Sequence, residues 1–142
     1  MKTKLVLLTV PLLVLAAFSA TAAPTGMQAG MWEITTTTEM LGMPMRMPPQ
    51  VLRHCYKEEN LKDAKGTLPV DKSCKVEDFK QSGNTVSWKM NCNRDGTSMV
   101  GSGEITYVGQ SYTGKMSVKG KTGGMDINMV SQYSAKRIGD CK

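Results

Sequence analysis

Three two-residue turns divide the C-terminal half of this chain into strands in which apolar and polar residues alternate. The turns are Asp95-Gly96, Gly109-Gln110 and Gly123-Gly124. Dipeptides of this kind close tight β-hairpins, and a two-residue loop fixes which residues of the two strands lie opposite each other. The chain is therefore constrained to an antiparallel meander, in which strands that are consecutive in the sequence are neighbours in the sheet.

The registers that the three turns impose agree on one apolar face. The opposed pairs are Trp88 with Gly103, Met90 with Gly101, Gly103 with Met116, Gly101 with Val118, Val118 with Met129 and Gly114 with Tyr133. A slip of one residue at any turn would move the apolar side chains of a whole strand to the polar face. Because glycine repeatedly stands opposite a large side chain, the sheet is free to coil strongly. We predict a mainly β fold, an antiparallel meander curled into a small barrel or half-barrel.

The hairpin before these strands decides how the four cysteines pair. Its turn, Gly83-Asn84, places Phe79 opposite Trp88, and one bulge beyond Phe79 brings the first cysteine of the hairpin across from its last. Four cysteines allow three connectivities, and this register selects one of them. The predicted disulfides are Cys74–Cys92 and Cys55–Cys141. Zinc ligation is disfavoured because the chain has no C-x-x-C pair.

The N-terminal half is less regular. Residues 31–40, "MWEITTTTEM", alternate like a strand, and residues 50–56, "QVLRHCY", have the length of another. Residues 57–64, "KEENLKDA", carry acids early and a lysine late, which suits the dipole of one or two helical turns. We expect one short helix between the N-terminal strands and the meander.

The first residues predict export. Lys2 and Lys4 precede an apolar run over residues 5–18, and small residues follow it. This is the pattern of a secretory signal peptide, and Ala20-Thr21-Ala22 supplies the cleavage site. We place cleavage after Ala22, with Ala23 as the alternative.

This cleavage site defines a signal peptide at 1–22 and a single disulfide-bonded β domain at 23–142. The 18 basic residues less Lys2 and Lys4 leave 16, so the mature charge is 16 − 12 = +4. The lysines are scattered and no aromatic ribonucleoprotein motif is present, so nucleic-acid binding is not expected. We expect a periplasmic monomer with no membrane span after cleavage, in a compartment where disulfides form.

No set of catalytic residues is visible in the sequence. His54 is the only imidazole, and it neighbours a cysteine that we expect to be oxidised. Glu58 and Glu59 are adjacent on the expected helix, so their carboxylates point in different directions. Catalysis needs a positioned base, nucleophile or metal, and we therefore predict a protein that is not an enzyme and has no cofactor.

Several longer segments carry a family resemblance. In chain order they are "GMWEITTTTEMLGMPMRMPPQ", a cysteine followed by a short acidic helix, "GNTVSWKMNC", "GSGEITYVGQSYTGKM" and the terminal "SAKRIGDC". In these segments and in its four cysteines the chain resembles the exported bacterial domain known as domain of unknown function 3617. The resemblance implies a periplasmic, disulfide-bonded, mainly β protein. Since that family has no assigned biochemical role, it implies no catalytic residue.

A second likeness concerns the fold. "GMW", residues 30–32, opens the first strand, and Arg137 lies near the end of the last one. This is similar to lipocalin-type barrels, in which a first-strand G-x-W tryptophan is covered by a basic side chain from the last strand. A barrel of this size is either packed solid or holds one small ligand. If it holds an apolar ligand, the expected ligand-binding residues are Trp32, Trp88, Tyr133 and Arg137. The alternative role is contact with a protein partner.

The methionines divide into two groups. Met90, Met99, Met116, Met125 and Met129 lie on the apolar strand face, where core filling is the expected role. Those of "MLGMPMRMPP", residues 40–49, lie in a Gly- and Pro-interrupted loop. Thioethers are soft ligands that favour Cu(I), so the alternative prediction is a copper site at Met43, Met45 and Met47, with His54 as an optional ligand. The competing interpretations are a loop folded over the barrel mouth and a patch that contacts a partner.

Overall fold

The computed structural model describes residues 26–43 and 47–142, and most of them lie in one antiparallel sheet. The expected signal peptide at 1–22 and Met45 lie outside the described residues. The strands are β1 (Gly30–Met40), β2 (Gln50–Tyr56), β3 (Cys74–Ser82), β4 (Thr85–Arg94), β5 (Thr97–Val108), β6 (Ser111–Thr122) and β7 (Met125–Gly139). A short helix, α1 (Glu58–Leu61), and a 3-10 turn, η1 (Ala64–Thr67), stand between β2 and β3.

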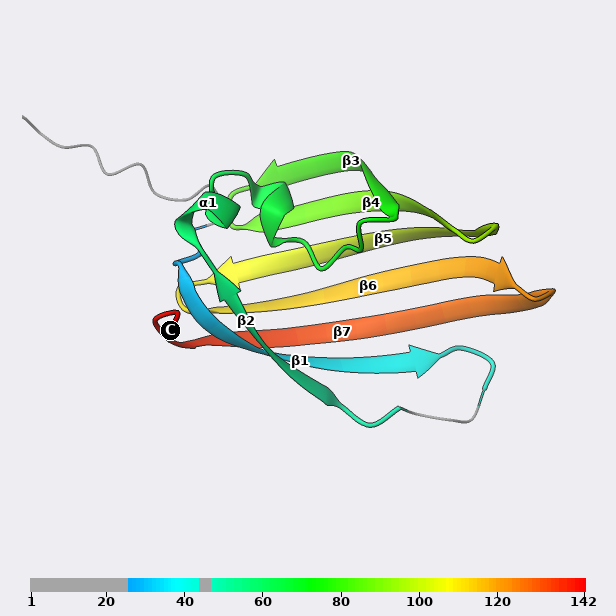
Figure 1. Ribbon diagram of the computed structural model, residues 1–142, viewed down its shortest axis with the longest axis horizontal. Helices are drawn as coiled ribbons and strands as arrows, with labels where there is room; N and C mark the ends of the chain where they lie inside the picture. Colours follow the sequence, from blue (N-terminus) through cyan, green and yellow to red (C-terminus); the bar gives the residue numbers. More distant parts are fainter. Residues whose placement is uncertain (1–25, 44–46) are drawn as a thin grey trace, which may run out of the picture.

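The strand order is β2-β1-β7-β6-β5-β4-β3, and the sheet does not close. The first strand pairs with both β2 and the last strand, β7. Figure 1 shows β2 crossing in front of β1, so the sheet curls without joining its two edges, β2 and β3. The mainly β fold and the single short helix are confirmed. The closed-barrel form of the prediction is wrong, because no pairing between β2 and β3 is present among the described strands.

The registers expected from the three turns are confirmed. Trp88 lies opposite Gly103, and Gly103 lies opposite Met116. Val118 lies opposite Met129. The left-handed backbone that these turns require falls on Asp95-Gly96, Gly109 and Gly123-Gly124. Turn chemistry therefore determines the pairing of the four strands from β4 to β7.

The bulge expected in β3 is also present. The register shifts between Glu77 and Lys80, and Asp78 adopts a positive φ of 47°. This extra residue sets Cys74 opposite Cys92, and the two form a disulfide. The second disulfide joins Cys55 of β2 to Cys141 beyond the end of β7. The structure thus has the connectivity that the hairpin register predicts.

Large side chains occupy the space above the inward-facing glycines. A Cβ atom built on Gly103 would collide with the ring of Trp88, and one on Gly101 would lie 2.6 Å from Cε of Met90. A Cβ on Gly114 would lie 2.7 Å from Cγ1 of Ile105. The glycines therefore let the sheet curl around bulky side chains, and they leave no hole at these three positions.

The inward face of the sheet is covered at one end only. Figure 1 shows α1 and η1 lying over the sheet at the end where the chain terminates, and the loop after η1 running from there to the start of β3. We call this the closed end. The opposite end, which carries the turns Asp95-Gly96 and Gly123-Gly124, is called the open end. The two ends share the same strands and differ in what packs on them.

Candidate functional site

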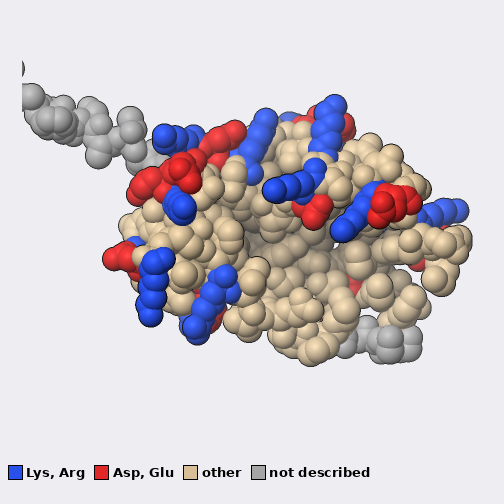
Figure 2. Space-filling model, viewed as in Figure 1, with Lys and Arg blue, Asp and Glu red and all other residues tan. Residues whose placement is uncertain are grey.

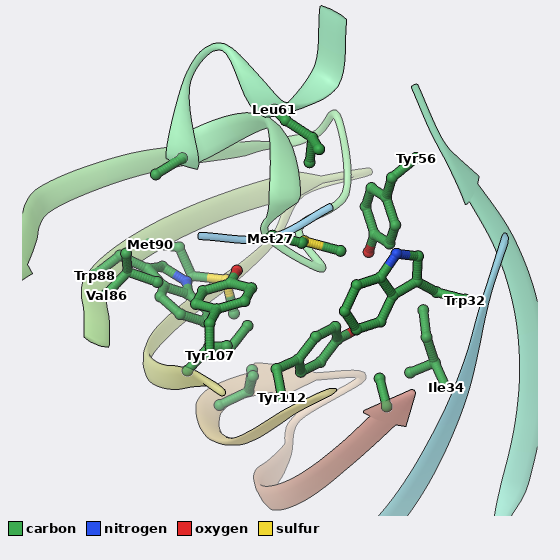
Figure 3. Close-up of a cluster of buried hydrophobic side chains, with 14 of the residues drawn as sticks. Met27, Trp32, Ile34, Tyr56, Leu61, Val86, Trp88, Met90, Tyr107 and Tyr112 are labelled. Atoms are coloured by element: carbon green, nitrogen blue, oxygen red, sulfur yellow. The ribbon is translucent and has the colours of Figure 1, made fainter. Parts of the chain in front are cut away.

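The closed end is a packed aromatic cluster. Trp32 is 0% exposed and stacks on Tyr112, with ring centroids 5.6 Å apart and planes 25° apart. Tyr56 meets the same indole edge-on at 6.4 Å. The indole N–H of Trp32 donates to the carbonyl of Gln28 at 3.0 Å. Figure 3 shows these rings converging with Met27. Trp32 is therefore a core residue with a satisfied polar atom, and it does not line a cavity.

Arg137 closes the same end from outside the aromatic cluster. Trp32 and Arg137 are cross-strand neighbours in β1 and β7. The guanidinium Nε donates to the carbonyl of Ala29 at 2.8 Å and its terminal nitrogen pairs with Asp140. A Cβ at Gly30 would lie 2.5 Å from that Nε, so Gly30 makes room for the arginine. The Trp–Arg neighbourhood expected from the sequence is present, but Arg137 fastens the N-terminal segment and its groups are already bonded.

Three buried tyrosines set the electrostatics of the closed end. Tyr107 hydrogen-bonds through its hydroxyl to Thr67 of η1 at 2.7 Å, which ties the 3-10 turn to β5. Burial raises the pKa of Tyr107 to about 12 and also raises the pKa of Tyr56 and of Tyr112. The three phenols stay neutral at physiological pH and act as packing groups.

The inward face at the open end forms a trough, which we call the methionine trough. Its residues are Met90, Met99, Met116, Val118, Met129 and Tyr133. Met99, Met116, Met129 and Tyr133 are only partly buried, although they have the same strand parity as the core. Figure 2 shows this face hollowed at its centre, with uncharged atoms on the floor and charged side chains around the rim. From Ile127 to Tyr133 the trough runs about 20 Å along β7.

A cavity opens at the outer end of the methionine trough. Its volume is about 430 Å³, and its lining residues are Arg94, Asp95, Thr97, Met99, Thr122 and Ile127. Ligand sites are concave, mostly apolar and carry a few polar groups at defined positions. The trough with this mouth has that composition.

The outer face of the sheet is polar, and its acids Asp78 and Glu33 are ion-paired. Asp78 lies 2.9 Å from Nζ of Lys89, and the hydrogen bond from Lys89 lowers the pKa of Asp78. Hydrogen bonds from Arg53 and Lys136 likewise hold the pKa of Glu33 below its usual range. A hollow of about 540 Å³ over β4–β6 is lined mostly by such charged and hydroxyl side chains. These carboxylates are held ionised, which does not suit a general acid.

The structure separates the four residues expected around a ligand. Trp32 and Arg137 lie in the closed end, while Tyr133 lies in the methionine trough. Trp88 lies between the two ends, and its ring covers Gly103. The sequence assigned the inward methionines to the core, and this holds for Met90, which is buried. The other trough methionines are only partly buried because α1 covers the opposite end of the sheet. The alternation of apolar and polar residues in the strands does not predict which end α1 covers.

The residues of the expected copper site are also separated. Met43 and Met47 lie in the β1–β2 connection and are 50% and 40% exposed. His54 is opposite Trp32, eight residues along β1 from its last residue, Met40, a separation of about 26 Å in an extended strand. The imidazole packs on Tyr56 instead, at 4.5 Å. In the described ranges, no group of three or more His, Cys, Asp or Glu side chains is arranged to hold a metal ion.

Comparison with known proteins places the chain in a family whose function is not assigned. Residues 27–141 match the family described as "Protein of unknown function (DUF3617)". The chain belongs to this family. No curated protein and no solved structure matches the chain. The family resemblance in the sequence is thus confirmed, and it adds no activity to the geometry described above.

None of the helices in residues 26–43 and 47–142 is long and apolar enough to cross a bilayer.

Proposed function

We propose that this chain is an exported binding protein without catalytic activity, and that the methionine trough takes a small apolar ligand. The observation that carries the proposal is the contrast along one strand face. Tyr107 and Tyr112 on this face are buried at the closed end, whereas Met99 and Met129 on the same face are only partly buried toward the open end. Burying the exposed methionine surface under an apolar ligand would be favourable by about 25 cal/mol per Å².

Methionine suits such a trough. Its side chain is unbranched and polarizable, so it adapts to ligands of different shape. The neighbouring glycines let the methionine chains lie flat on the sheet; a Cβ on Gly120 would lie 2.7 Å from Cγ of Met99. The floor can therefore adjust to a ligand without moving the backbone.

The proposal that the protein is not an enzyme rests on the state of its polar groups. The imidazole of His54 packs on a tyrosine ring, and the adjacent Cys55 is in a disulfide. Glu33 and Asp78 are ion-paired on the outer face. Export is supported by the two disulfides, because such bonds persist in oxidising compartments.

The proposal is tested with an apolar fluorescent probe and a matched pair of variants. Met99 points into the trough, while its neighbour Val100 points outward and is 54% exposed. N-phenylnaphthylamine should brighten in the presence of the wild-type protein. Met99→Asp should weaken its binding at least tenfold, because a short carboxylate cannot leave the apolar floor. Val100→Asp should bind the probe like the wild type.

Two results would contradict the proposal. One is that the wild-type protein does not brighten the probe. The other is that Val100→Asp weakens binding as much as Met99→Asp does while circular dichroism shows both variants folded. Native mass spectrometry of protein purified from the periplasm supplies the complementary result, a co-purifying mass of lipid size.

A second candidate function, Cu(I) binding at the β1–β2 connection, is supported by the exposure of its thioethers. Met43 and Met47 are exposed residues, and thioethers are soft ligands that favour Cu(I). Cu(I) should then bind, and replacing Met43, Met45 and Met47 by leucine should abolish binding, since leucine keeps the apolar bulk and removes sulfur. Equal Cu(I) affinity of the parent and the triple variant against a competing chelator would show that these methionines are structural.

A further inference from the structure

Trp88 carries a polar atom that the fold leaves without a partner. The residue is 2% exposed, and its indole nitrogen makes no hydrogen bond to any other described residue. The other tryptophan, Trp32, donates its N–H to the carbonyl of Gln28. Burying an N–H without a hydrogen-bond partner is unfavourable, so a bound ligand that supplied an acceptor at Trp88 would be stabilised.

The unpaired N–H lies beside the methionine trough, one cross-strand row nearer the open end than Tyr133. Trp88 and Gly103 are cross-strand partners, and the next inward pair toward the open end is Met90 with Gly101. Figure 3 shows the indole nitrogen of Trp88 on the side of Met90. The Met90 side chain lies over Gly101. Because methionine has no branch at Cβ, this side chain can change rotamer, and the Trp88 N–H then becomes accessible from the trough.

The other polar groups nearby already have partners. In the row of Trp88, Ser131 shares a hydrogen bond of 2.9 Å with Thr38. The hydroxyl of Tyr133 donates to Sδ of Met116 at 3.9 Å. Trp88 is thus the donor in this row that has no acceptor among the described residues.

The charge of the acceptor follows from the inward-facing residues. Within the described strands, Arg94 and Arg137 are the charged side chains of inward parity. Arg94 ends β4 at the mouth of the trough, and Arg137 lies in the closed end, so neither shares the row of Trp88. Lys65 of η1 holds its ammonium over the ring of Phe79, 5.5 Å from the centroid, so a carboxylate or phosphate beside Trp88 would have to draw this lysine from that ring to gain a counter-charge. An uncharged carbonyl oxygen would not need one.

We infer that the ligand of the methionine trough is an uncharged acyl ester or amide, whose carbonyl oxygen accepts the hydrogen bond of the Trp88 N–H while its alkyl chain lies over Met99, Met116 and Met129 toward the open end. This inference rests on the proposed function of the trough. It adds the orientation of the ligand and the functional group that the protein recognises.

The test compares two ligands that differ in one carbonyl. Methyl laurate has an ester carbonyl, and dodecyl methyl ether has the same chain length with a methylene group in its place. Competition against N-phenylnaphthylamine should show that the wild-type protein prefers the ester by about 5- to 10-fold, the range that one satisfied hydrogen bond gives. Trp88→Phe should bind both ligands with affinities within about twofold of each other. Val100→Asp, on the outer face, should keep the preference.

A measurement on the wild-type protein guards against a Trp88→Phe variant that does not fold. The indole N–H proton of Trp88 should shift downfield in nuclear magnetic resonance spectra when the ester binds and stay in place when the ether binds. The N–H proton of Trp32 is the internal control and should not move with either ligand.

The outcomes separate this inference from the proposed function. Equal affinity of the wild-type protein for ester and ether, or a preference that persists in folded Trp88→Phe, overturns the role of Trp88 and leaves the apolar trough standing. Failure of the wild-type protein to bind either ligand or the probe overturns the trough itself.

Discussion

The two ends of the inward face are built on the same strands and differ in residue type. The closed end packs Trp32, Tyr107 and Tyr112 under a cover that starts at α1. The open end presents methionines and glycines, and α1 and η1 do not reach it (Figure 1). The comparison indicates that the closed end contributes most of the stability, whereas the open end offers an apolar surface for a ligand. The predictions below are ordered from the largest expected effect to the smallest.

The disulfides give the first contrast, because there is one toward each end. Cys55–Cys141 fastens the closed end across 86 residues, and Cys74–Cys92 joins β3 to β4 in the open half across 18. Loop entropy predicts that replacing both cysteines by serine costs about 4.5 kcal/mol for the first pair and about 3 kcal/mol for the second. Urea unfolding of the two double variants measures the difference. Equal losses would mean that loop length does not set these contributions.

Large-to-small changes give the second contrast. Trp32→Ala removes a fully buried ring and should lower the free energy of unfolding by about 4 kcal/mol. Met116→Ala removes a partly exposed side chain of the trough and should cost about 1 kcal/mol. A cost at Met116 that matched that at Trp32 in urea unfolding would show that the open end is as tightly packed as the closed end.

Glycine substitutions separate close approach from backbone strain. Gly30 and Gly139 have nearly the same φ, 143° and 145°, but a Cβ at Gly30 meets the carbonyl of Gly139 and the guanidinium of Arg137, and a Cβ at Gly139 meets nothing within 4 Å. Gly139→Ala should cost about 1–2 kcal/mol from strain alone. Gly30→Ala should cost about 3 kcal/mol, because it also displaces the guanidinium. Thermal unfolding that ranked the two variants equally would remove the arginine from this account.

Alkaline pH should weaken the closed end. The pKa of Tyr107 is raised by burial to about 12, above the value near 10 of an unfolded chain. Its contribution is therefore fully present below pH 10 and is lost as the pH rises from about 10 to about 12, a change of about 3 kcal/mol. Ultraviolet titration follows ionisation, and Tyr107→Phe is the control that lacks this group. A normal phenol titration near pH 10 in the folded protein would contradict the burial.

Local turn chemistry made much of the sheet predictable. Asp95-Gly96 and Gly123-Gly124 fix register over two residues each, so the pairing from β4 to β7 follows without knowledge of the rest of the fold. The bulge between Val76 and Phe79 was predictable because it returns Val76 to the apolar face, opposite Met90, and the pairing of Cys74 with Cys92 follows from that register. The turn registers and the bulge depend on residues that are close in sequence, and the alternation of apolar and polar residues is enough to predict them.

Two features were not predictable in this way: that the sheet stays open between β2 and β3, and that its two ends differ in packing. Closure depends on whether β2 reaches β3, and these edge strands are joined by a segment without periodicity. The position of this segment over one end of the sheet is fixed by individual contacts, such as the hydrogen bond between Thr67 and Tyr107. The unpaired N–H of Trp88 is likewise invisible in sequence, because it depends on which acceptors fall within reach.

The central claim, a packed end and a ligand-binding end on one strand face, is tested most directly by methyl nuclear magnetic resonance of methionine. Protein labelled at the methionine methyl groups would be titrated with methyl laurate. The account predicts that the methyl signals of Met99, Met116 and Met129 shift together and saturably, while that of Met27, buried in the closed end, does not move. A shift at Met27, or shifts confined to Met43 and Met47, would contradict it.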